Sequence, residues 1–263
     1  MRYLFLLVVF IFISCGKYDL QNRIILAKSI SKKANFKSKI IKTKDFEIQT
    51  YIKKSNSNIL KIYLEGDGFS WLDKNTISSN PTPINPVALR LASIDKSNSN
   101  IAYIARPCQY ITYNCNNQYW SDKRYSLKII NNINQAISII KNNSNSKKIE
   151  LIGFSGGGAI AILIASIRDD ISKITTISGN LNHKLLNKYH NVSPMNNSLN
   201  PIDVALKVSH IPQIHYIGLE DKIIPLIIVQ SFKKASKNKK IKIIKVKNVT
   251  HTKGWIEYFS RIN

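Results

Sequence analysis

Ser155 is the residue of this chain whose surroundings most directly indicate chemistry. It stands in Gly153-Phe154-Ser155-Gly156-Gly157, after an apolar run typical of a strand and before a small-residue run typical of a helix. A serine on a sharp strand-to-helix turn needs glycine two positions before and two after it, because larger side chains would collide there. The pattern therefore predicts that Ser155 is a nucleophile.

A glycine-rich turn before a helix can instead bind phosphate. A phosphate-binding loop would contain Gly-Lys-Ser/Thr, which is absent, and a dinucleotide fingerprint would be expected on the first strand. Only 10 of the 263 residues are glycine, yet the residues at 156–158 are three consecutive glycines, so chance is a poor explanation for the cluster. The nucleophile remains the preferred interpretation.

A serine nucleophile needs a base within hydrogen-bond distance, and the base needs an acid that orients it. His251 follows the last expected strand and precedes the last expected helix. Asp221 stands in the turn after the preceding strand, with Glu220 and Asp203 as alternative acids. We expect His251 to take the proton of Ser155 and Asp221 to orient His251.

The elements that must position these residues are short apolar strands alternating with helices. This alternation predicts an α/β fold, with a mostly parallel sheet covered by helices on both faces. Residues 180–207 are polar with two prolines and are expected to be irregular. The strands are expected at 46–51, 59–64, 101–105, 149–152, 174–177, 212–218 and 241–246, and the helices at 19–33, 86–92, 126–141, 156–167, 225–236 and 254–261.

The order Ser155, Asp221, His251, with each residue after a strand, resembles that of the α/β-hydrolase superfamily. A narrower resemblance is to poorly characterised bacterial lipoproteins described as α/β hydrolases, and it covers most of the mature chain. It is carried by the segments Glu-Gly-Asp-Gly-Phe-Ser-Trp at 65–71, Asn-Pro at 85–86, Arg-Pro-Cys-Gln-Tyr at 106–110 with Cys115 and Trp120, and Ser-Leu-Asn-Pro at 198–201.

The resemblance implies an α/β-hydrolase fold and two backbone N–H groups that stabilise the oxyanion. One N–H is that of Gly156, and by motif position the other is that of Asp67, with Gly68 as the alternative. Glu65 stands where many relatives have the histidine of His-Gly, and the loop can also be interpreted as a simple glycine turn. The loops from Phe69 and from Cys108 are then expected to border the site.

Substrate contacts are expected from residues of these two loops. They are Gly68, Phe69 and Tyr110, and the aromatic rings of Trp71 and Trp120 are further candidates for an acyl pocket. Plain packing is the other interpretation of these rings. No cofactor and no metal site is expected.

The N-terminus has the pattern of an export signal. Met1-Arg2 is a basic start, residues 4–13 are apolar, and Ser14-Cys15-Gly16 follows. Residues 12–15 resemble a bacterial lipobox, although Phe12 stands where leucine is usual. This resemblance implies cleavage before Cys15 and its lipidation, and the alternative is a plain secretory signal. We expect a signal peptide at 1–14, a linker with a short helix at 15–37, and one catalytic domain at 38–263.

Two cysteines remain if Cys15 is acylated. Cys108 and Cys115 form an even pair in an exported chain, which favours a local disulfide. Free thiols are the alternative, and a metal pair is disfavoured because no further cysteine or histidine lies at ligand spacing nearby. By the resemblance, a disulfide here would stiffen a wall of the site.

The chain is strongly basic, with 39 Lys and Arg against 15 Asp and Glu and a net charge of +24. The lysines are spread along the sequence and no nucleic-acid-binding motif is present, so we interpret them as a solvated surface and expect no nucleic-acid partner. Attraction to acidic lipids is a possible secondary effect.

Together these features predict an envelope-anchored serine hydrolase that cleaves an ester or related acyl bond of a small-molecule or lipid substrate. It would face the periplasm or the exterior. The alternatives are an acyltransferase or peptidase using the same residues, a non-catalytic lipoprotein that binds a ligand through this fold, and a basic protein that binds anionic polymers or membranes.

Overall fold

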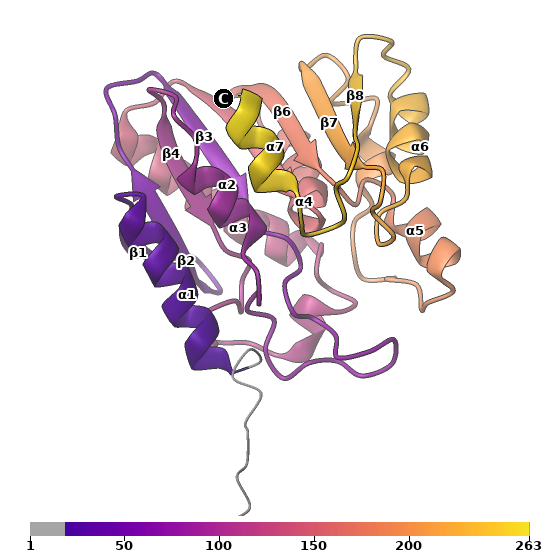
Figure 1. The fold of residues 1–263 in the computed structure, drawn as a ribbon, viewed down its shortest axis with the longest axis horizontal. Coiled ribbons are helices and arrows are strands. Elements are labelled where there is room, and N and C mark those ends of the chain that lie inside the picture. The colour runs from indigo at the N-terminus through magenta and orange to yellow at the C-terminus, as the bar shows by residue number, and fades with distance from the viewer. Residues whose placement is uncertain (1–18, 263) are drawn as a thin grey trace, which may run out of the picture.

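A single eight-stranded sheet runs through the protein. The computed structural model describes residues 19–262, and the strand order is β1-β2-β4-β3-β5-β6-β7-β8 (Figure 1). β2 pairs antiparallel with β1 and with β4, and the pairs from β4 to β8 are parallel. The predicted mostly parallel sheet is therefore confirmed. The strands are β1 Lys37–Lys42, β2 Glu47–Lys53, β3 Ile59–Leu64, β4 Asn100–Ile104, β5 Lys148–Phe154, β6 Ile171–Ile177, β7 Gln213–Gly218 and β8 Lys242–Val246.

Helices cover both faces of the sheet, and each face has its own apolar core. Residues of α3, α4 and α6 form one core with the sheet, and residues of α1, α2 and α7 form the other (Figure 1). The helices are α1 Leu20–Lys33, α2 Val87–Ser93, α3 Leu127–Ser144, α4 Gly156–Ala165, α5 His183–His190, α6 Leu226–Ser236 and α7 Trp255–Ile262.

The sequence pattern explains why the central elements form where they do. All five residues of β4 and all ten of α4 are buried, as expected of a central strand and of a helix that is apolar on every side. α3 is amphipathic: Ile129, Ile133, Ile137 and Ile140 lie on its buried face at helical spacing. The hydroxyl of Ser126 accepts the N–H of Ile129 and caps the helix start.

One strand, one α-helix and short 3₁₀ helices were not predicted. No strand was predicted before residue 46, yet β1 begins at Lys37, the last residue of the expected linker, and forms the sheet edge; only Ile41 in it is buried, so it has no apolar pattern. Its pairing with β2 is a backbone interaction that side-chain patterns do not reveal. The prediction that 180–207 is irregular was wrong for α5, whose start is capped by Asn182. A short 3₁₀ helix also spans Pro201–Val204.

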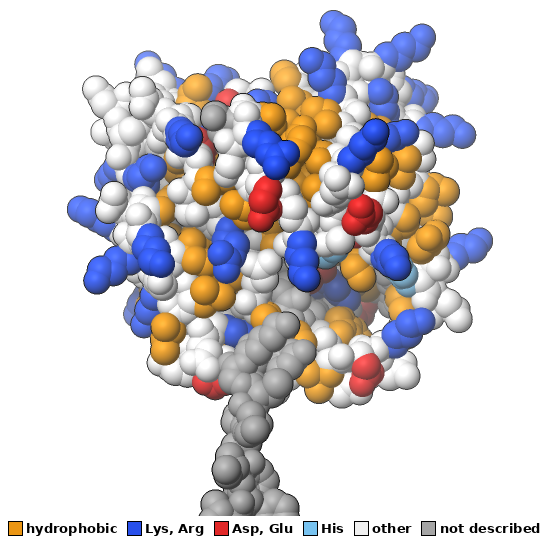
Figure 2. Space-filling model, viewed as in Figure 1, with side chains coloured by type: hydrophobic (Ala, Val, Ile, Leu, Met, Phe, Trp, Pro, Cys, Tyr) orange, Lys and Arg blue, Asp and Glu red, His pale blue; other side chains and the backbone are white. Residues whose placement is uncertain are grey.

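The basic side chains are distributed over the surface. Figure 2 shows Lys and Arg side chains scattered across the whole visible face, with few Asp and Glu between them. In the described part of the chain, no helix combines the length and the apolarity needed to cross a membrane. The expected signal peptide at 1–14 and the expected lipidation at Cys15 lie outside the described residues.

Candidate active site

Ser155 occupies a strained turn between β5 and α4. Its φ of 51° and ψ of −118° are a conformation that residues with a β-carbon rarely adopt. Hydrogen bonds hold it there: its N–H donates to Ile177 O at 2.9 Å, and its carbonyl accepts the N–H groups of Gly158 and Asn180, each at 3.0 Å. The turn therefore presents the Ser155 side chain at the carboxyl edge of the sheet.

The glycines around Ser155 are required by close packing. An ideal β-carbon on Gly153 would lie 2.2 Å from Gly157 O, and one on Gly157 would lie 2.1 Å from Leu64 O. These contacts are with backbone atoms, which cannot move aside as a flexible side chain could. The physical reason for glycine at both positions is therefore the one the sequence predicted.

Ser155, His251 and Asp221 form a continuous hydrogen-bonded chain. His251 Nε2 lies 3.1 Å from Ser155 Oγ, and His251 Nδ1 lies 2.9 Å from Asp221 Oδ2. An ionised carboxylate only accepts hydrogen bonds, so Nδ1 is the protonated nitrogen and Nε2 accepts the Ser155 hydroxyl. The structure thus brings together the three residues that were predicted as nucleophile, base and acid.

Asp221 is fixed in the orientation that this chain needs. Its Oδ1 accepts the N–H groups of Ile223 at 2.8 Å and Ile224 at 2.9 Å, which leaves Oδ2 for His251. Its side chain has no solvent exposure. Burial opposes ionisation, but the interaction with His251, chiefly its hydrogen bond, outweighs it and holds the Asp221 pKa below its ordinary value.

The two alternative acids lie elsewhere. Glu220 is exposed to solvent, although it directly precedes Asp221. Asp203 lies in the 3₁₀ helix at 201–204. The turn after β7 therefore points only Asp221 toward the imidazole.

The loop that carries His251 is tied to the segment before α2. Asn85 Nδ2 donates to Thr252 O at 3.2 Å, and Arg90 Nε donates to Asn85 Oδ1 at 2.7 Å. On the other side, Trp255 Nε1 donates to His251 O at 3.0 Å. In the sequence, Asn85 is notable only for the Asn-Pro resemblance. The structure identifies it as a contact that holds the histidine loop.

The segment after β3 lies against the start of α4, as expected for an oxyanion loop. The hydroxyl of Tyr125 and two guanidinium groups bind the Asp67 carboxylate: Arg106 Nη1 lies 2.9 Å from Oδ1, Arg124 Nη1 3.0 Å from Oδ2, and Tyr125 Oη 3.0 Å from Oδ2. Burial opposes ionisation of Asp67, but Arg124 and Arg106 outweigh it and lower its pKa. Sequence reasoning considered only the backbone of Asp67 and missed this carboxylate cluster.

The N–H groups in this segment are not equally available. The N–H of Gly66 donates to Glu65 Oε1 at 2.9 Å, and Gly66 O accepts Gln109 Nε2 at 2.9 Å. Within residues 19–262, no protein acceptor takes the N–H of Asp67 or of Gly156. The two donors named from the sequence are thus available, and among the described residues no protein acceptor takes the N–H of Gly68 either, so the alternative donor stays open.

Glu65 points into the interior instead of toward Ser155. It is 1% exposed, and its Oε1 accepts the N–H groups of Gly66 and, at 3.4 Å, of Ala88. Its Oε2 is buried without a hydrogen-bond partner, as are the hydroxyls of Tyr103 and Tyr110. Burial raises the Glu65 pKa to about 7, although the two N–H groups oppose the shift.

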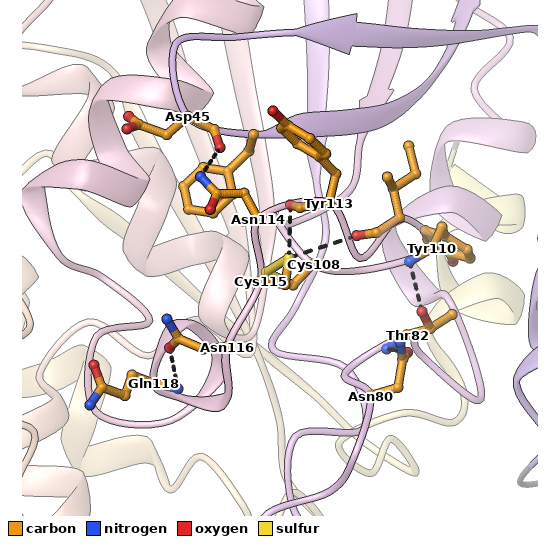
Figure 3. The surroundings of a disulfide bond; sticks show 12 residues. Asp45, Asn80, Thr82, Cys108, Tyr110, Tyr113, Asn114, Cys115, Asn116 and Gln118 are labelled. Carbon is orange, nitrogen blue, oxygen red and sulfur yellow. Dashed lines mark hydrogen bonds between the residues drawn. A yellow bond between two sulfur atoms is a disulfide. The ribbon is translucent and has the colours of Figure 1, made fainter.

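The disulfide between Cys108 and Cys115 is confirmed, with the two Cα atoms 5.7 Å apart (Figure 3). The loop that it closes is joined to the loop from Phe69, because the N–H of Tyr110 donates to Thr82 Oγ1 at 2.7 Å. The Trp120 Nε1 also donates to Ser78 O at 3.0 Å. These two loops therefore form one wall beside Asp67.

The residues expected to contact substrate differ in how exposed they are. Gly68 is exposed and Phe69 is half-buried, with the Arg23 guanidinium 5.5 Å from the Phe69 ring. The Tyr110 hydroxyl is buried and packs with the α2 core. Trp120 is 9% exposed and belongs to the core of the other face. Tyr110 and Trp120 are accordingly packing residues that shape the wall.

Comparison with known proteins gives a clear result only for structures. No protein-family model and no curated protein matches the chain. The chain is similar to Est1E from Butyrivibrio proteoclasticus, with 15% identity over 86% of this chain and 95% of that one, and a TM-score of 0.60. A putative lipase, lip1, from Acinetobacter baumannii AYE has 14% identity over 91% and 93%, and a TM-score of 0.62.

An α-β serine hydrolase homologue from Coxiella burnetii is also similar, with 12% identity over 86% of this chain and 94% of that one, and a TM-score of 0.60. The match extends over nearly the full length in each case. The protein therefore has the α/β-hydrolase fold, as its sequence predicted. At these identities the comparison establishes the fold and leaves the chemistry to the residues of the site.

Proposed function

We propose that this protein is a serine hydrolase that cleaves an ester or related acyl bond. The observation that carries the proposal is the hydrogen-bonded chain from Asp221 through His251 to Ser155 on a strained turn. Two structural neighbours, one described as a putative lipase and one as a serine hydrolase homologue, support the same chemistry.

The geometry supports a two-step reaction. His251 Nε2 takes the hydroxyl proton as Ser155 Oγ attacks the acyl carbonyl, and the carbonyl oxygen becomes negative. The N–H groups of Gly156 and Asp67 stabilise that oxygen. His251 then gives the proton to the leaving alcohol, and an acyl-serine ester remains. Water, deprotonated by His251, attacks this ester, releases the acid and restores Ser155.

A fluorophosphonate probe tests the proposal because it labels only an activated serine. We expect labelling of the wild-type protein and none of Ser155→Ala. Ser166→Ala is the matched control, since it removes another buried serine, at the end of α4, and should leave labelling intact. An unlabelled wild-type protein, under conditions that label a control hydrolase, would support a non-catalytic binding protein instead.

We also propose that the mature protein is attached to a membrane of the bacterial envelope through lipid on Cys15. The apolar run at 4–13 and the Ser14-Cys15-Gly16 sequence support this proposal. Mass spectrometry of the purified protein should find an N-terminal acylated Cys15. A mature chain that begins elsewhere, or an unmodified Cys15, would contradict it.

A further inference from the structure

The described chain begins at the same edge of the molecule as the candidate active site. Arg23, in the first turns of α1, donates from Nη1 to Thr82 O at 2.6 Å and to Asn80 O at 3.3 Å. Those carbonyls belong to the loop that starts just after Asp67. In Figure 1 the start of α1 lies at the lower end of the molecule, together with the loops that follow the parallel strands.

The distance from this edge to the proposed anchor is short. Four residue steps separate Cys15 from Asp19, the N-cap of α1, and they span at most about 14 Å when fully extended. The 14 residues of α1 then lead about 21 Å away from that point. A lipid on Cys15 would hold the start of α1, and with it the edge that carries Ser155, close to the bilayer.

The loops at this edge expose large apolar side chains. Each of the loops after β3, β4, β6 and β7 contributes at least one, and together we call them the apolar rim. Single exposed apolar residues are ordinary on a protein surface, but their presence on four segments at the edge that carries the site is a pattern that fits an interface. The rim residues and their exposures are Leu72 58%, Tyr113 62%, Leu199 42%, Leu219 50% and Ile223 52%.

Basic side chains accompany the apolar rim. Acidic residues are present as well, at Asp73, Asp122 and Glu220, but they are fewer. A surface that combines apolar tips with lysines suits the boundary between acyl chains and anionic headgroups, where both kinds of group are stabilised. The lysines on the same loops and on α5 are Lys74, Lys123, Lys184, Lys188, Lys222 and Lys253.

We propose that the apolar rim docks on an anionic lipid bilayer, and that the acyl substrate is an ester lipid of that same bilayer. The inference rests on the proposed hydrolase function and on lipidation of Cys15. The tether sets which edge of the domain meets the membrane, and the rim inserts around the site. A lipid then reaches Ser155 directly from the bilayer, without crossing water.

A fluorescence experiment on the lipidated mature protein tests the docking surface. Leu72→Cys and Ile223→Cys, each with Ser155→Ala to keep the lipids intact, carry a polarity-sensitive maleimide dye. The introduced thiol takes the label because Cys108 and Cys115 are disulfide-bonded. The vesicles contain phosphatidylglycerol and phosphatidylethanolamine, with a nitroxide-bearing lipid as the quencher.

The matched control is Ile167→Cys. Ile167 is 48% exposed, close to the 52% of Ile223, and it follows α4, whose ten residues lead about 15 Å away from Ser155. We expect the lipid quencher to reduce the dye signal at least threefold more at 72 and 223 than at 167. Equal quenching at all three positions, stronger quenching at 167, or no quenching would overturn the proposal.

A second measurement separates this inference from the proposed function. The measured quantity is the ratio of the rate on a vesicle-embedded ester to the rate on a soluble ester. The double variant Leu72→Glu, Leu199→Glu should lower this ratio at least fivefold, whereas Ile167→Glu should leave it unchanged. An unchanged ratio would contradict the substrate class. The dyes at 72 and 223 can be quenched while Ser155 of the wild-type protein takes no fluorophosphonate. In that case the docking surface stands and the hydrolase proposal fails.

Discussion

The carboxylate of Asp67 fills the space beside Gly156. An ideal β-carbon on residue 156 would lie 2.0 Å from Asp67 Oδ1 and 2.8 Å from the hydroxyl of Tyr125. The two N–H groups proposed as oxyanion donors therefore belong to segments that are packed directly against each other. Arg106 and Arg124 hold the Asp67 carboxylate in place through ion pairs, so the distance between the two donors is set by side chains far apart in the sequence.

The close contact predicts that Gly156→Ala will lower kcat strongly. The added methyl must push Asp67 away or shift α4, and either movement displaces an oxyanion donor. We expect kcat on a soluble ester to fall about 10²–10³-fold, the loss typical of one missing donor. Ser166→Ala is the control, because it changes a buried residue at the other end of α4 and adds no group beside Ser155. Equal kinetics for Gly156→Ala and wild type would contradict the assignment of this donor.

Replacing the acid predicts a loss of rate with little loss of structure. Asp221→Asn keeps the shape of the side chain but favours the wrong tautomer of His251, so kcat should fall about 10⁴-fold. The exposed neighbour gives a matched control, since Glu220→Gln should retain at least half of the wild-type activity. Steady-state kinetics of both variants, with circular dichroism to verify folding, decide the point. A stronger effect at Glu220 would reassign the acid.

The buried carboxyl of Glu65 predicts a dependence of stability on pH. Burial raises its folded-state pKa from 4.5 to about 7, so the folded state binds the proton more tightly than the unfolded state. The resulting stability is fully present below pH 4.5 and is lost as pH rises through about 7. By this linkage the wild-type protein should lose on the order of 3 kcal/mol relative to Glu65→Gln between pH 5 and pH 8.

Urea unfolding at the two pH values measures this difference. Glu220→Gln, which removes an exposed carboxyl, should follow the wild type at both. A constant difference in the free energy of unfolding between wild type and Glu65→Gln would show that Glu65 stays in one protonation state over the range.

Loss of the disulfide is expected to lower the free energy of unfolding modestly. The loop from Cys108 to Cys115 spans a sequence separation of seven, and closing a loop of this size stabilises a fold by about 2–3 kcal/mol on the chain-entropy model. Cys108→Ser combined with Cys115→Ser should lower the free energy of unfolding by that amount. Because the loop is bonded to Thr82, KM should also rise more than kcat falls. Identical urea transitions for the double variant and wild type would contradict this.

The sequence was informative where local pattern and chain order suffice. Buried strands and amphipathic helices have short-range signatures, so the alternation of β3 to β8 with helices was predictable. The glycines around Ser155 are needed because larger side chains would collide with nearby backbone. His251 follows the last strand, and the carboxyl ends of parallel strands lie at one edge of the sheet. By contrast, β1 is an edge strand with exposed residues, and α5 is short and polar, so neither has a strong periodic signal.

By itself the sequence determined the fold class, the nucleophile turn and the order of Ser155, Asp221 and His251, because each depends on neighbouring residues or on strand order. Only the tertiary structure decided which carboxyl meets His251, since Asp221 and Glu220 are adjacent and differ in the direction in which the turn points them. It also decided that Asp67 is paired with Arg106 and Arg124, which lie 39 and 57 residues away. Such contacts depend on how distant loops pack, and no local pattern records that.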